Sequence, residues 1–112
     1  MASQLTSNPL ASCMAESETG VVMTLPPSLP GETAAQMADA ILATRSNPLR
    51  LDAGAVERID TPCLQVLLSA ARLWREDGVA MEITGCSPVL EGNLGILGLT
   101  TAEFEVGDTI HA

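Results

Sequence analysis

The segment from Pro62 to Glu76 constrains the fold more than any other part of the chain. At about 100° per residue, four polar side chains fall on one narrow stripe, and apolar side chains occupy most of the remaining helix surface. The stripe consists of Gln65, Ser69, Arg72 and Glu76. An apolar face this wide needs cover on more than one side. We expect Trp74 and the leucines to be core residues packed against a sheet; the alternative hypothesis is that part of this face contacts another protein.

Short apolar runs on both sides of this helix predict strands. Residues 21–26 form a run rich in β-branched residues that stops at two prolines, and residues 49–54 predict a second strand that ends at Asp52. Residues 79–84 follow a glycine and predict a third strand. Residues 103–106 are predicted to add an edge strand.

Two further helices are predicted between and after these strands. Residues 32–45 have apolar residues at helical spacing, an acid in the first turn and Arg45 in the last, which suits the helix dipole. A last helix is predicted to begin with Ser87 as its cap and a proline at its first position. Gly92 and Gly95 make this last helix intrinsically weak.

Alternation of strands and helices predicts one small α/β domain. We expect a sheet of about four strands, mostly parallel, with the helices mainly on one face, because helical crossovers join parallel neighbours. Residues 1–20 are rich in Ser, Thr, Asn and Ala without periodicity, and are predicted to be a flexible N-terminal arm. The domain is predicted to span residues 21–108, followed by a tail at 109–112.

Charge and hydropathy exclude several classes of partner. The formal net charge of −9, from 14 acidic and 5 basic residues, repels nucleic acid and anionic membrane surfaces. No apolar run approaches the roughly 18 residues of a membrane span, so direct membrane insertion is not expected. The first nine residues contain no Lys, Arg or apolar run, so no secretion signal is predicted, and three cysteines fit a reducing compartment. These features predict a cytoplasmic protein.

The sequence lacks the motifs of catalysis and metal binding. It contains no GxSxG, GxxxxGK[ST] or GxGxxG pattern, its cysteines at 13, 63 and 86 have no CxxC spacing, and His111 stands alone in the tail. We therefore expect no catalytic residue, no metal and no cofactor. Cys63 is the one candidate nucleophile, because a helix N-terminus stabilises a thiolate, but it lies on the apolar side of the helix, where cysteine is usually inert.

The stretch "RIDTPCLQVLL", residues 58–68, supports two interpretations of Thr61. Thr61 can cap the helix, with Pro62 at the first helical position. Such a cap stabilises the helix by about 1 kcal/mol. The same position exposes a hydroxyl to a kinase, and the free N–H groups of the helix start would hold a phosphate there. From the residues alone, capping is the favoured interpretation.

Residues 49–99 resemble the STAS domain, the module of bacterial anti-sigma-factor antagonists. The matching landmarks are Asp52, Val56, Ile59, Asp60, Thr61, Leu64, Gly78, Ser87, Pro88, Gly98 and Leu99. In that family a partner kinase phosphorylates the Ser or Thr after the Asp, so the resemblance makes Thr61 the candidate phosphoacceptor. Pro62 and Cys63 depart from the family pattern, which has a second small residue and a glycine there. The opening hairpin of the family is expected to shrink to a single strand at Val21.

The sequence is most similar to compact STAS proteins of alphaproteobacterial chemotaxis gene clusters. That resemblance implies a non-enzymatic regulatory interaction module in chemotaxis or sigma-factor control. Its partner would be a signalling protein such as an anti-sigma kinase or a chemotaxis component. The residues expected to bind this partner are Asp60, Thr61, Pro62, Cys63 and Gln65. The alternative is the STAS subunit of a phospholipid-transport ABC complex, which docks on its ATPase and also has Thr after the Asp.

Overall fold

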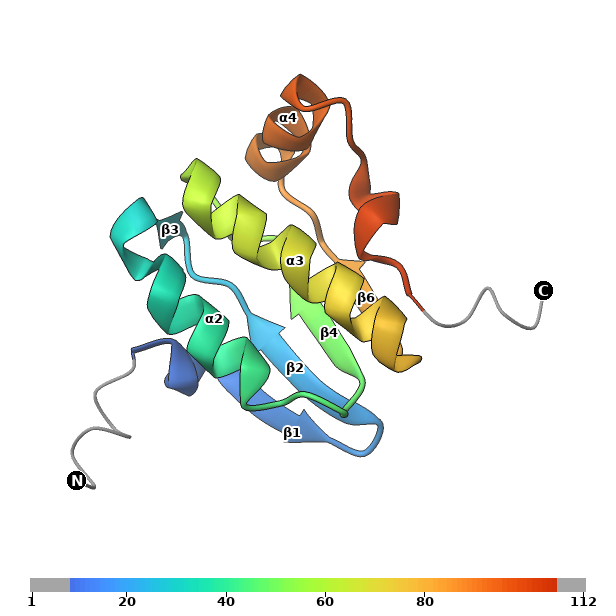
Figure 1. Ribbon diagram of the computed structural model, residues 1–112. Coiled ribbons are helices and arrows are strands. Elements are labelled where there is room, and N and C mark those ends of the chain that lie inside the picture. Colours follow the sequence, from blue (N-terminus) through green and yellow to red (C-terminus); the bar gives the residue numbers. More distant parts are fainter. Residues whose placement is uncertain (1–8, 107–112) are drawn as a thin grey trace.

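The computed structural model describes residues 9–106, which form an α/β domain around one four-stranded sheet (Figure 1). The strand order is β1-β2-β4-β6; β1 is antiparallel to β2, and the other neighbours are parallel. The strands are β1 (Met14–Ser17), β2 (Gly20–Thr24), β4 (Leu49–Asp52) and β6 (Met81–Thr84). This architecture confirms the predicted fold class, including the strand that ends at Asp52.

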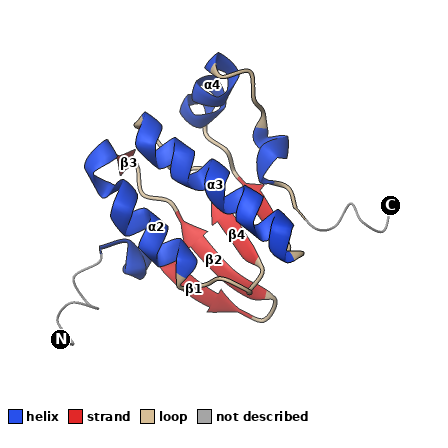
Figure 2. Cartoon of the chain, viewed as in Figure 1, coloured by secondary structure: helices blue, strands red, loops and turns tan. Residues whose placement is uncertain are grey.

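Helices α2 (Ala34–Leu42) and α3 (Thr61–Asp77) lie side by side over one face of the sheet, as Figure 2 shows. The shorter α4 (Pro88–Ile96) follows β6 and packs near the start of α3. A small parallel pair, β3 (Ser28–Leu29) with β5 (Arg58–Ile59), lies where the chain enters the first two helices. The helices therefore lie mainly on one side of the sheet, as predicted.

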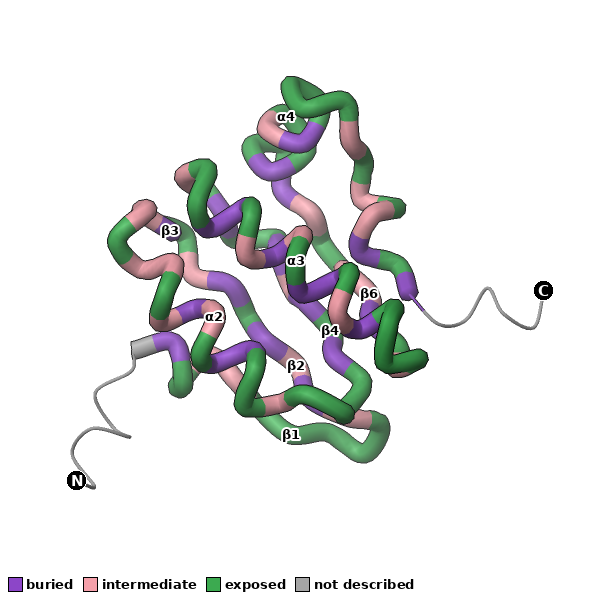
Figure 3. The backbone as a smooth tube through the Cα atoms, in the orientation of Figure 1, coloured by how far each residue is buried: buried purple, intermediate pink, exposed green. Residues whose placement is uncertain are grey.

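The core lies between the sheet and the helices α2 and α3, where the buried residues gather in Figure 3. Leu49 and Leu51 point inward from β4 while Arg50 between them is exposed, the alternation expected of a sheet with one covered face. Trp74 is fully buried, and its indole N–H donates to the Asn47 carbonyl at 2.8 Å. Its assignment to the core is therefore confirmed. The predicted polar stripe of α3 is exposed at all four positions.

The N-terminal arm predicted over residues 1–20 is wrong for residues 9–20, which are folded. A 3₁₀ turn, η1 (Pro9–Cys13), leads into β1, and β1 pairs with β2, so the sheet opens with a hairpin and not a single strand at Val21. Three of the four β1 side chains are exposed, so their polarity concealed the strand. The hairpin turn ends at Gly20, whose φ is +148°. A Cβ added there would lie 2.3 Å from the Pro48 carbonyl oxygen, so this position requires glycine. Residues 1–8 and 107–112, including the predicted tail, lie outside the described residues.

Two other predicted elements also differ from the structure. The helix predicted over residues 32–45 is a 3₁₀ turn, η2 (Gly31–Thr33), followed by α2, and it ends at Leu42. Arg45 therefore lies beyond the helix, where its guanidinium pairs with Asp77 at 2.9 Å. Residues 103–106 do not form the predicted strand, because η3 (Thr101–Phe104) buries Phe104 in the core and leaves one bridge to β6.

The start of α4 agrees with the sequence. The Ser87 hydroxyl accepts from the Leu90 N–H at 3.2 Å, and Pro88 is the first helical residue. No helix of the described residues is long and apolar enough to cross a bilayer.

The α3 register predicts how substitutions divide between core and surface. Leu67→Ala should lower the free energy of unfolding by about 2 to 5 kcal/mol, because Leu67 is fully buried and its removal leaves a cavity. Gln65→Ala, on the exposed stripe of the same helix, should change it by no more than about 0.5 kcal/mol. Urea denaturation of both variants measures the difference, and equal losses would contradict this register.

Candidate functional site

The predicted site lies where β5 passes into α3. Asp60 is the residue before the helix, with extended backbone angles of φ −83° and ψ 157°, and Thr61 and Pro62 are its first two helical residues. The prediction that Thr61 caps the helix is therefore wrong by one position. The Asp60 main-chain carbonyl begins the helix by accepting from the N–H groups of Cys63 and Leu64 at 3.0 and 3.1 Å. The Thr61 side chain is left exposed.

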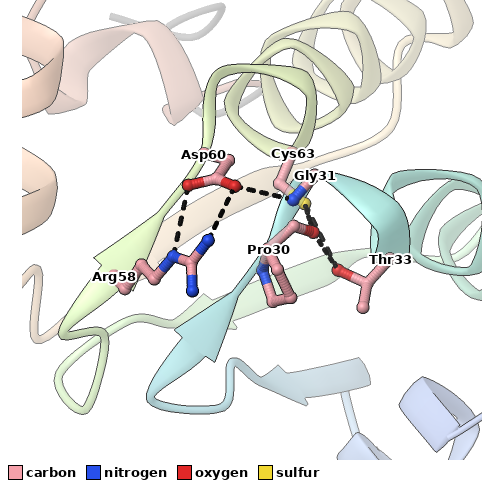
Figure 4. A network of polar contacts seen from close by, with 6 residues as sticks. All are labelled: Pro30, Gly31, Thr33, Arg58, Asp60 and Cys63. Atoms are coloured by element: carbon pink, nitrogen blue, oxygen red, sulfur yellow. Dashed lines mark hydrogen bonds and ion pairs between the residues drawn. The ribbon is translucent and has the colours of Figure 1, made fainter.

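The Asp60 carboxylate points away from its own helix and binds two other segments (Figure 4). Its Oδ2 accepts from the Gly31 N–H at 2.9 Å, and the Arg58 guanidinium donates Nε to Oδ1 at 3.3 Å and Nη2 to Oδ2 at 3.2 Å. The hydrogen bonds from Arg58, and then that from Gly31, lower the pKa of Asp60. Asp60 therefore joins the start of α3 to a residue 29 positions earlier in the chain.

Cys63 makes a second connection to the same loop. Its side chain is fully buried, and the thiol donates to the Pro30 carbonyl with an Sγ–O distance of 3.2 Å. The Thr33 hydroxyl donates to that carbonyl at 2.7 Å and lies 3.4 Å from the Cys63 sulfur (Figure 4). Burial removes the solvent access that a reactive thiolate needs, so the geometry favours a structural role for Cys63.

Pro62 completes the contact between the loop and the helix. A Cβ added at Gly31 would lie 3.4 Å from the Pro62 Cγ, so the glycine backbone lies directly against the proline ring. We call these contacts of the Pro30–Thr33 loop with Asp60, Pro62 and Cys63 the brace. Pro62 and Cys63, the two residues expected from the sequence to depart from the STAS pattern, both contact this loop.

The predicted partner-binding residues divide between surface and interior. Thr61, Pro62 and Gln65 are exposed, and the Asp60 side chain is 38% exposed. Cys63 is buried, so it can affect a partner only through the brace. Among the described residues, no group of three or more His, Cys, Asp or Glu side chains is placed to hold a metal ion.

A groove between α2 and α3 extends the exposed surface. It holds about 290 Å³, and both helices contribute apolar side chains to it. Its lining includes Ile41, Leu42, Pro62, Val66 and Leu73. Leu42 is 49% exposed, one of few large apolar side chains on the described surface. Sequence reasoning missed this contribution of α2, although Leu42 stands about 100° around the helix from the buried Ile41.

The family described as "Mlab, STAS domain" matches residues 14–106 of this chain. The matched range begins with β1 and ends at Val106, which bridges to β6, so it contains the whole sheet, the brace and the groove. No curated protein matches the chain significantly.

The lowered pKa of Asp60 sets the pH range in which its own contacts in the brace are complete. Because the folded-state pKa lies below the ordinary value of about 3.9, the stabilising contribution of Asp60 is complete above that value and is lost as pH falls through the folded-state pKa. In an NMR titration, the Gly31 amide resonance should shift with a midpoint below about 3.9. In Asp60→Asn this titration should disappear. A midpoint at or above the ordinary value in the wild type would contradict the contact.

Proposed function

The chain belongs to the STAS-domain family over residues 14–106, and we propose that it acts by docking on a partner protein through the start of α3. STAS domains are generally regulatory protein–protein interaction modules, and typically not enzymes. The observation that carries the proposal is that Thr61, Pro62 and Gln65 are exposed beside an apolar groove. The brace holds this part of the surface in place.

The composition of this surface suits a protein partner. Leu42, Pro62 and Val66 give the groove an apolar lining, to which Gln65 and Ser69 add polar groups. Protein interfaces combine an apolar centre with a polar rim. The brace fixes the loop before α2 in the free protein, so less conformational freedom is lost on binding.

The first candidate partner is a signalling protein such as an anti-sigma kinase or a chemotaxis component, in a cytoplasmic signalling pathway. The Thr61 hydroxyl supports it, because this hydroxyl is exposed at the first residue of α3. Phosphorylation there would add a charge of about −1.5 to −2 to the docking surface. We propose that this charge is the switch that releases the partner.

A second candidate is a STAS subunit that docks on the ATPase of a phospholipid-transport ABC complex. The brace favours this alternative, because Pro62 and Cys63 stiffen the segment that a kinase would have to approach. A rigid, preorganised surface is suited to a permanent subunit interface, because little conformational freedom is lost on assembly. In that case Thr61 contacts the partner directly and stays unmodified.

Substitution of Thr61 tests the docking surface. Thr61→Asp should reduce recovery of the partner in affinity purification from the native cell by at least about tenfold, because charge is added at the contact. Thr19→Asp is the matched control, since it adds the same charge to an exposed threonine in the β1–β2 turn, and it should leave recovery unchanged. Thr61→Ser should behave as wild type.

The identity and modification of the recovered protein separate the two candidates. A kinase or chemotaxis protein, together with phosphate on Thr61 in mass spectrometry, is the result expected for the signalling module. A transporter ATPase with unmodified Thr61 is the result expected for the transport subunit. Equal recovery with wild type and Thr61→Asp would contradict docking through this surface.

A further inference from the structure

The arginines of this acidic chain divide into paired and unpaired groups. All five basic residues other than histidine are arginines, and three of them contact carboxylates. The three ion pairs are Arg45–Asp77, Arg50–Glu82 and Arg58–Asp60. Arg72 and Arg75 are exposed and form no ion pair with any residue between positions 9 and 106. Both belong to α3, the helix that begins at the docking surface.

The unpaired arginines continue the face of α3 that begins at Thr61. Thr61, Gln65, Leu68, Arg72 and Arg75 follow one another at steps of four, three, four and three residues, so they lie on one side of the helix. We call these five residues the α3 stripe. At 1.5 Å per residue, Arg72 lies about 16 Å along the helix from Thr61. That length fits within one ordinary protein–protein interface.

The α3 stripe is cationic on a protein whose formal net charge is −9. It contains no acidic residue, although the exposed Glu76 borders it four residues after Arg72, and Asp77, the last residue of α3, is already bound by Arg45. At physiological salt, charges more than about 8 Å away are largely screened, so a docked partner senses mainly this local charge. The net charge of the whole chain therefore does not describe the surface that the partner meets.

We infer that the partner presents carboxylate side chains to Arg72 and Arg75 while its apolar side chains contact the same helix near Leu68. This inference rests on the proposed docking through the start of α3 and adds the chemistry of the partner surface. Two guanidinium groups one helical turn apart offer planar donor pairs that match carboxylates. An acidic protein segment is favoured over an extended polyanion, because the α3 stripe offers only two arginines to a phosphate backbone and places the apolar Leu68 beside them.

The inference also gives the direction of a switch at Thr61. An acidic partner that covers the α3 stripe would meet a phosphate on Thr61 as a like charge at the end of the same surface. Phosphorylation would therefore weaken binding and mainly slow association, because rim charges act on the encounter rate. A basic partner would respond in the opposite way.

Two designed helical peptides test the sign of the partner charge. Both carry the same leucines on one face, and they differ only in having glutamates or lysines on the other. Titrated into the ¹⁵N-labelled full chain, the glutamate peptide should shift the amide resonances of residues 65–75 and bind at least about tenfold more tightly than the lysine peptide. Arg72→Gln should weaken binding of the glutamate peptide about fivefold or more, and Arg50→Gln, which removes the same charge from the sheet, should leave it unchanged.

Each other outcome overturns the inference. Preference for the lysine peptide, equal binding of both peptides, or binding of neither at millimolar concentration would show that the stripe does not select carboxylates. Tighter binding to anionic lipid vesicles than to the glutamate peptide would assign the arginines to lipid phosphate. None of these results contradicts the docking proposal itself. That proposal is tested separately, by whether Thr61→Asp reduces recovery of the partner.

Discussion

The Asp60 carboxylate is the group on which the geometry of the docking surface depends. Its Oδ2 accepts from the Gly31 N–H at the start of η2, while its own main-chain carbonyl begins α3. One residue therefore connects the start of α3 to the turn before α2, the two helices that line the groove. Arg58, which forms an ion pair with Asp60, is exposed, and exposed ion pairs contribute little to stability. The hydrogen bonds from Arg58 lower the pKa of Asp60, so the carboxylate stays ionised to lower pH than an ordinary aspartate.

The brace also accounts for two residues that the family pattern leaves unexplained. A glycine at position 63 could not donate to the Pro30 carbonyl, and a small residue at position 62 would not cover Gly31 as the proline ring does. Both residues therefore add contacts between α3 and the loop before α2. The exposed residues between and beside them, Thr61 and Gln65, are thereby presented on a rigid base.

The α3 register could be predicted because its signal is periodic over many residues, and the strands β2, β4 and β6 because each is an apolar run next to proline or glycine. Ser87 was found because a cap and the following proline are adjacent in sequence. Asp60 and Thr61 are both good caps, and the choice between them is made by tertiary structure: the Asp60 N–H donates to Leu29 across the β3–β5 pair, which holds Asp60 extended. The contact with Gly31 spans 29 positions, so no local pattern could indicate it. Strand β1 was missed because its pairing uses backbone groups while its side chains face water.

Site-specific photo-crosslinking in the native cell tests the central claim most directly, that a partner docks at the braced start of α3. A photoreactive residue at Gln65 should yield an adduct with a second protein, and one at Glu82, whose side chain on the sheet is 45% exposed, should yield none. Asp60→Ala should lower the yield from position 65, because the brace is lost while the exposed residues remain. Adducts from position 82 and none from position 65 would contradict the account.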